Sequence, residues 1–361
     1  MSITEFCHSF PAVRGIQAGR PCYIAMCPMR IVPKLFKFDE EEVPPELRAQ
    51  RTLNKSRIPE IASYLTDNPT NYTLSSLTAS VDAMVNFEPL SDTGSGQNMG
   101  TLYVPMDAQI LINDGQHRRA AIEQAIRENS ELGYDNISVL FFIDEGLVRS
   151  QQMFADLNKH AVRPSDSIST LYDFRDSQSD LARYLSNEVH IFSRMTELEK
   201  SSISNRSSKL FTLSSIKNAS KALLRKGSKD LVNEQEKVLA ATYWNEVANN
   251  MPDWVLAKNK EIVTYELREQ YIHAHAVMLQ AMGNIGADLL SDYETNWKDK
   301  LKLLTNVDWS RQNKDWEGRA LVHGRVSKAR SNVILTGNYI KQLLNLPLND
   351  IEDKQEQEYV S

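Results

Sequence analysis

The residues best suited to chemistry form one short run, Asp114-Gly115-Gln116-His117-Arg118-Arg119. Asp114 can cap a helix, Gly115 permits a positive φ, and the free N–H groups of a first helical turn carry partial positive charge. The arginines, with a protonated His117, would add full charge and forked donors that suit phosphate. The run therefore predicts an anion site. The alternative, equally open on spacing alone, is a plain Asp-Gly turn with arginines on a solvated face.

The elements around this run must position it. Residues 108–112 form a compact apolar strand pattern, and residues 117–128 have the spacing of an amphipathic helix. Residues 137–143 have the pattern of a second buried strand, followed by a helix over 148–158. This alternation predicts an α+β fold in which a mixed sheet forms an N-terminal domain, residues 1–165.

Beyond that domain the pattern becomes helical. We expect an α-helical domain over residues 166–349 and an acidic tail over 350–361. Earlier in the chain, residues 20–38 predict a strand pair or one bent strand, and residues 58–65 predict a helix. The helical spacing of the second domain covers residues 169–188, 214–225, 234–249, 261–290 and 333–344.

The composition favours a globular protein and excludes a membrane-spanning one. The 361 residues are 41% hydrophobic and 24% charged, as in a globular protein, and no apolar run approaches the roughly 20 residues of a spanning helix. With no export signal, we expect a cytoplasmic protein. Cys7, Cys22 and Cys27 are expected to be free thiols. Their spacing does not suit zinc, and no metal site is expected.

The charge distribution suggests where nucleic acid could bind. A net charge of −6 excludes a protein that coats nucleic acid by bulk charge, yet Lys200–Lys229 holds eight basic residues and no carboxylate. On a helix, Lys217, Lys221 and Arg225 would form a basic row able to follow phosphates. An ordinary solvated helix face is the alternative. The candidate DNA-binding residues are Arg206, Lys209, Lys217, Lys221, Arg225 and Lys226.

Asp114 to Arg118, read as DGQHR, resembles the signature of the DGQHR-domain proteins. Nearly the whole chain is similar to one such family, the DndB family of DNA sulfur modification proteins. The resemblance implies a fold like that of ParB and sulfiredoxin, in which this turn meets nucleotide phosphates or the DNA backbone. The phosphate- or nucleotide-binding residues that it implies are Asp114, Gly115, Gln116, His117, Arg118, Arg119, Arg57, Asn158 and Arg163.

The sequence departs from both of those patterns. Gln116 stands where the nucleophilic cysteine of sulfiredoxin is expected, so that chemistry is not implied. ParB-type proteins carry Glu-Arg-Arg after the glycine, so the use of CTP is not carried over. What the family implies is a bacterial accessory protein that binds double-stranded DNA at the promoter of its own operon and represses the phosphorothioate modification genes. Other sulfur-modification proteins are further expected partners, and a homodimer would suit a palindromic operator.

Two other functions stay open. One is an ATP-dependent or DNA-nicking enzyme that uses the turn around His117 and Arg118, with ATP and a divalent metal as cofactors and no identified catalytic residue. The other is a component that binds the modification enzymes, for which Trp297, Trp309 and Trp316 would be interface residues. The alternative for these tryptophans, and the more frequent one, is membership of a core.

Overall fold

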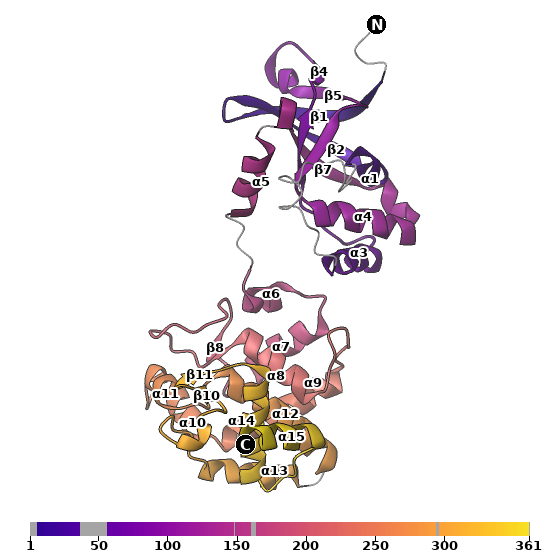
Figure 1. Ribbon diagram of the computed structural model, residues 1–361. Coiled ribbons are helices and arrows are strands. Elements are labelled where there is room, and N and C mark those ends of the chain that lie inside the picture. Colours follow the sequence, from indigo (N-terminus) through magenta and orange to yellow (C-terminus); the bar gives the residue numbers. More distant parts are fainter. Residues whose placement is uncertain (1–5, 37–55, 148, 160–163, 294–295, 361) are drawn as a thin grey trace. The chain divides into compact units, whose positions relative to one another are not determined.

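The computed structural model describes residues 6–36, 56–147, 149–159, 164–293 and 296–360. The chain divides into two compact units, residues 1–162 and 163–361 (Figure 1). The first unit contains a seven-stranded mixed sheet, and the second is largely helical. The expected α+β architecture, with a mixed-sheet N-terminal region followed by a helical region, is therefore confirmed at this level.

The sheet of the first unit has the strand order β4-β5-β1-β2-β7-β3-β6. Its neighbouring strands are antiparallel except for β3 and β7, which are parallel. β1 and β2 form a hairpin whose two loop residues, Ala18 and Gly19, both have positive φ, as a tight hairpin turn requires. The strands are β1 (Cys7–Gln17), β2 (Arg20–Pro28), β3 (Leu77–Asp82), β4 (Asn86–Pro89), β5 (Met99–Pro105), β6 (Gln109–Asp114) and β7 (Asn136–Ile143).

Helices cover the sheet from both sides. α1 (Val32–Leu35), α3 (Arg57–Asp67) and α4 (Gln116–Glu128) lie on one side, and α5 (Ser150–Lys159) lies on the other (Figure 1). The inward side chains of β3 and β7 form a closed apolar core with Ala121, Ile122 and Ala125 of α4. Short 3₁₀ helices connect these elements: η1 (Met29–Ile31), η2 (Gly94–Asn98), η3 (Ser130–Tyr134) and η4 (Glu145–Leu147).

The second unit packs its helices around α8 and α12. α8 packs against α7 and α12, and α12 also packs against α14. The helices are α6 (Asp166–Tyr172), α7 (Ser177–Glu188), α8 (Leu213–Leu223), α9 (Glu234–Asn249), α10 (Pro252–Lys258), α11 (Thr264–Gln270), α12 (Ala276–Asp292), α13 (Trp297–Leu301), α14 (Arg330–Leu343) and α15 (Asp350–Val360). Short elements complete it: β8 (Thr196–Glu197), β9 (Phe211–Thr212), β10 (Leu321–Val322), β11 (Arg325–Val326), η5 (Lys302–Asn306) and η6 (Lys314–Trp316).

Tryptophans form part of this helical core. Trp297, Trp309 and Trp316 are all buried, with Trp309 and Trp316 stacked on each other. Of the two interpretations of these tryptophans, the structure supports the core and contradicts exposed interface residues. Burial of such large apolar surfaces gives them a role in the stability of the unit.

Three secondary-structure predictions are also wrong in part. Residues 29–35 form helical turns (η1 and α1), where a strand was expected. The expected helix 169–188 is two helices, because Asp176 caps a new helix with hydrogen bonds from Gln178 and Ser179. The expected helix 261–290 is interrupted at 271–275, where Ile272 N–H donates to Trp309 O at 3.0 Å.

The acidic C-terminal segment is helical and carries the partners of two buried cations. Lys341 on α14 donates to Glu352 at 2.6 Å and to Asp288 at 2.5 Å, and Arg319 forms an ion pair with Glu356. Because an unpaired buried charge is costly, Glu352 fixes α15 against α14, and Glu356 fixes it against the segment that carries Arg319. In the described residues, no helix is both long and apolar enough to span a bilayer. Cys7, Cys22 and Cys27 form no disulfide bond with one another.

Candidate functional site

The DGQHR run forms the turn between β6 and α4, as the sequence predicts. β6 ends at Asp114, Gly115 has φ of +106°, and α4 begins at Gln116. A side chain at position 115 would be strained by this φ and would collide with Leu77. Only glycine therefore lets the chain turn this closely over β3, and α4 begins without a side-chain cap.

Arg118 is bound to the fold rather than displayed to solvent. Its guanidinium donates to Ser75 Oγ at 2.7 Å, to Ser76 O at 3.1 Å and to Asp114 Oδ2 at 2.7 Å. Its buried Nε has no hydrogen-bond partner among the described residues. Arg118 thus ties the start of α4 to the segment that precedes β3, and Asp114 is its counter-ion instead of a helix cap.

Arg119 and Gln116 are anchored in the same way. Arg119 donates to Phe36 O at 3.1 Å and Pro33 O at 2.9 Å, and it forms an ion pair with Glu123 at 2.8 Å. The buried Gln116 amide donates to Ile112 O at 3.1 Å. Three of the polar side chains in the run therefore serve first to fix the turn.

His117 and Arg57 are the members of the predicted set that lie together at the edge of the turn. Burial and the positive charges of Arg57 and Arg118 hold the pKa of His117 below its usual range. The ring is therefore mostly neutral at pH 7, which removes one of the cations that the sequence had suggested. An anion bound here would reverse the repulsion and raise that pKa.

A buried polar cluster under the turn is absent from the predicted set. Asn113 is fully buried, donates to Ser80 Oγ at 2.7 Å and accepts from Ser150 Oγ at 2.9 Å. These bonds join β3, β6 and the first residue of α5 directly behind the motif. The available signal is a polar residue at an inward position of an otherwise apolar strand, because such a side chain needs buried partners.

Asn158 and Arg163 are the remaining two residues of the predicted phosphate-binding set. Asn158 lies in α5, whose first residue bonds to Asn113. Arg163 lies outside the described residues.

Of the predicted basic row, Lys217 and Lys221 lie on α8, which is largely buried. The expectation that Arg225 continues this helix is wrong, because α8 ends at Leu223 and Arg225 has a positive φ of 52°. Lys217 is bound at 2.5 Å to Asp176, which caps α7, and Arg225 is bound to Asp288 of α12 at 2.8 Å. Lys226, just beyond the helix, pairs with Glu236 at 2.6 Å. The predicted basic row is thus partly neutralised by acids from other helices.

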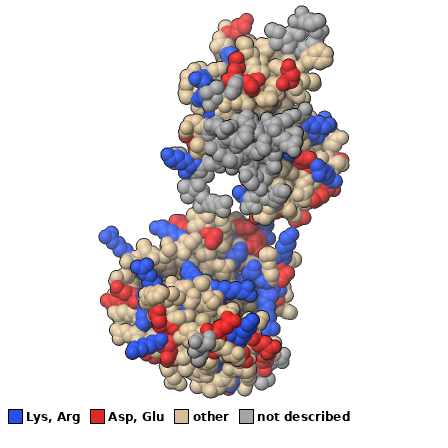
Figure 2. Space-filling view, viewed as in Figure 1, with Lys and Arg blue, Asp and Glu red and all other residues tan. Residues whose placement is uncertain are grey.

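The other three predicted DNA-binding residues form no ion pair among the described residues. Lys209 donates to Arg194 O at 2.8 Å, while Arg206 is exposed and Lys221 is half-buried. Neither Arg206 nor Lys221 has an ion pair within the described residues. On the face shown in Figure 2, basic and acidic side chains of the second unit are interspersed. Arg206 and Lys221 are therefore the members best placed to meet phosphates.

A metal centre has no preformed ligand set in the described parts of the chain, where no three His, Cys, Asp or Glu side chains are grouped to hold an ion.

Comparison with known protein families agrees with the motif. Residues 10–347 match the DndB family, described as DNA-sulfur modification-associated. The chain belongs to the DndB family. The DndB match begins within β1 and ends just beyond α14, so it covers both the turn and the basic segment. No curated protein and no solved structure matches the chain significantly.

Proposed function

We propose that this DndB-family protein is a cytoplasmic bacterial DNA-binding accessory protein that represses its own DNA phosphorothioate modification operon. The observation that carries the proposal is the family match across both units, which associates the chain with DNA sulfur modification. The duplex upstream of that operon is the proposed partner. A homodimer, and contacts with other modification proteins, belong to the same proposal.

The N-terminal unit contributes a ParB- or sulfiredoxin-like DGQHR domain in this proposal. Supporting it, the turn offers the uncapped first N–H groups of α4 beside Arg57 and His117. Free N–H groups at a helix start attract phosphate oxygens. Because Arg118 and Arg119 are already bound to the fold, phosphate contact here rests on the backbone, His117 and Arg57.

The C-terminal unit contributes the main DNA-contacting surface in this proposal. Arg206 and Lys221 have no carboxylate partner among the described residues, so a phosphate of the DNA would not have to displace one there. Lys217, Arg225 and Lys226 would have to exchange Asp176, Asp288 and Glu236 for phosphate. An exchange of one anion for another gains little, so we expect these three to contribute less.

The proposal is tested by titrating a fluorescent duplex from the upstream region of the operon, beside an unrelated duplex, at two salt concentrations. Repression predicts tighter binding to the operon duplex and affinity that falls steeply with salt, because phosphate contacts release counterions. Equal affinity for both duplexes would remove the regulatory role.

Single variants then locate the surface. Arg206→Ala and Lys221→Ala should each reduce the slope of log affinity against log salt by about 1, the value of one lost phosphate contact. Lys229→Ala is the matched control, since Lys229 is exposed in the same acid-free segment. If Lys229→Ala lowers the slope as much as Arg206→Ala does, the assignment of the surface is wrong.

A nucleotide-dependent or DNA-nicking enzyme is the second candidate function. It is favoured by one observation, the buried Nε of Arg118, which has no partner among the described residues beside an uncapped helix start. ATP with a divalent metal is the cofactor it would require. Phosphate release and strand nicking should be measured with and without duplex DNA, using His117→Ala as the variant. Absence of both activities in the parent protein would eliminate this candidate.

A further inference from the structure

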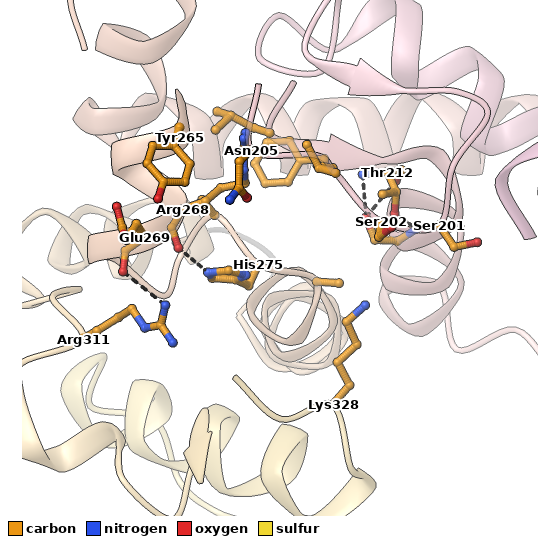
Figure 3. A pocket seen from close by; sticks show the side chains of 16 residues that line it. Ser201, Ser202, Asn205, Thr212, Tyr265, Arg268, Glu269, His275, Arg311 and Lys328 are labelled. Carbon is orange, nitrogen blue, oxygen red and sulfur yellow. Dashed lines mark hydrogen bonds between the residues drawn. The ribbon is translucent and has the colours of Figure 1, made fainter. Parts of the chain in front are cut away.

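The second unit contains a pocket of about 390 Å³ that no sequence motif marks. It lies between the serine-rich loop that begins at Ser201, the start of α8, α11 and the start of α12 (Figure 3). Arg311 and Lys328 complete its wall from segments far along the chain. A volume of this size is in the range of pockets that bind small molecules.

The lining carries an excess of positive charge. Three cations, Arg268, Arg311 and Lys328, face a single carboxylate, that of Glu269. None of the three cations forms an ion pair within the described residues. The carboxylate of Glu269 accepts a hydrogen bond from the Tyr265 hydroxyl. This local excess of cations contrasts with the net charge of −6 of the whole chain.

Arg268 is a buried cation of the pocket wall without a carboxylate partner among the described residues. It is 9% exposed, and its guanidinium donates to backbone oxygens of the loop, those of Ser204 at 3.1 Å and Ser207 at 3.2 Å, and also to Lys209 O. These bonds satisfy its donors but do not neutralise its charge. The other buried cations of this unit each pair with at least one carboxylate: Lys237, Arg319 and Lys341.

Arg311 and Lys328 have capacity to bind a ligand. Arg311 donates to Glu269 O at 3.1 Å and to Gly324 O at 2.9 Å, which positions the guanidinium beside the pocket. Lys328 is exposed, and no hydrogen bond of its amino group is seen in the described residues. A guanidinium and an amino group at one pocket provide the forked and single donors that phosphate-binding sites use.

The start of α12 adds to the same field. This helix has 17 residues, begins at Ala276 in the pocket wall, and has no side-chain cap. His275 precedes it and hydrogen-bonds to Arg268 O at 2.8 Å. The partial positive charge of a long helix start therefore lies beside the three cations.

We propose that this pocket binds the phosphate group of a ligand, with Arg311 and Lys328 as direct contacts and Arg268 as a positioning residue that holds the serine-rich loop. The site is separate from the DGQHR turn. The phosphate can belong to a free nucleotide or to the DNA backbone, and the two sources are separated by experiment. The proposal does not depend on repression, since a phosphate ligand would bind whether or not the operon is recognised.

The test is calorimetric titration of the full chain at low salt with inorganic phosphate, AMP and a short DNA duplex, each in separate arms. Lys328→Ala and Arg311→Gln should weaken binding by about tenfold each, the usual value of one charged hydrogen bond. Lys229→Ala is the matched control and should bind as the parent does. Thermal unfolding of each variant without ligand checks that the fold is intact.

The arms give distinct outcomes. Binding of AMP or inorganic phosphate that the two variants weaken supports the pocket with a free phosphorylated ligand. Weakening of duplex binding alone supports the pocket with the DNA backbone as the source of phosphate. The proposal is overturned if neither variant changes any arm, or if the parent binds none of the three. If both variants bind the duplex as the parent does, the proposed DNA-binding function stands, but this pocket takes no part in DNA binding.

Discussion

The DGQHR turn and the α11–α12 pocket both contain cations at the start of a helix, but they differ in whether carboxylates neutralise these cations. At the turn, Arg118 and Arg119 are each bound to a carboxylate and to backbone oxygens of neighbouring segments. At the pocket, Arg268, Arg311 and Lys328 have no carboxylate partner in the described residues. A motif rich in arginine can therefore be structural, whereas cations scattered along the sequence can converge without neutralisation. Charge that is available to a ligand depends on tertiary partners.

The largest expected effect is at Gly115, since the turn depends on it. Gly115→Ala combines an unfavourable φ with a collision against Leu77, and we expect a loss of about 3 kcal/mol in the free energy of unfolding. Gly19→Ala is the control, because Gly19 has a positive φ of 73° but open space around it. That variant should lose about 1 kcal/mol. Denaturant unfolding measures both values, and equal losses would mean that the close approach to Leu77 is unimportant.

The second prediction contrasts one cation from each region. Arg118→Ala removes three hydrogen bonds and leaves Ser76 O without its partner, so we expect a loss of about 2 kcal/mol in the free energy of unfolding. Lys328→Ala removes an exposed side chain without such bonds and should change stability by less than about 0.5 kcal/mol. Both are measured by denaturant unfolding. A large loss in Lys328→Ala would show that the pocket cations are structural too.

The third prediction concerns pH and the pocket wall. Burial, together with the charges of Arg268 and Arg311 and the neighbouring His273, lowers the pKa of His275 from 6.5 to about 4. The unfolded chain therefore binds a proton more readily than the folded one between these values. The stabilisation is complete above about pH 6.5 and is lost as the pH falls towards 4. At pH 5 the expected loss is about 2 kcal/mol.

His275→Gln separates this contribution from others. The pKa of His117 and that of buried His273 are also lowered, so part of the acid sensitivity should remain in the variant. Thermal unfolding of parent and variant at pH 7 and pH 5 gives the difference. An unchanged dependence on pH in His275→Gln would contradict the assignment.

Local pattern was sufficient for the strand, turn and helix around the motif. Residues 108–112 form a compact apolar run that suits a buried strand, and the apolar residues of 117–128 recur at helical spacing. The Asp-Gly pair marks the turn between this strand and this helix. Local pattern failed where distant segments decide the outcome. The interruption after α11 arises because Tyr271 and Ile272 pair with Ser310 and Trp309, and no helical periodicity shows this.

The site shows the same division between local and distant information. The stretch Lys200–Lys229 lacks acids in sequence, yet Asp176 and Asp288 from other segments of the chain neutralise Lys217 and Arg225. The pocket was missed for the opposite reason, because positions 268, 311 and 328 share no spacing that predicts a site. Counting charges along the chain locates basic segments but not their tertiary partners.

The smallest expected effect tests whether any positive field remains at the turn. Arg57 is exposed at the start of α3, and its charge helps to lower the pKa of His117. Arg57→Ala removes that repulsion, so the pKa of His117 should rise, as followed by histidine NMR over a pH titration. Arg127→Ala, at the other end of α4 and paired with Glu123, is the control and should leave it nearly unchanged. If Arg57→Ala also leaves the pKa of His117 unchanged, the charge of Arg57 does not act on the turn. The turn would then have little positive potential to attract an anion, and its difference from the pocket would be larger.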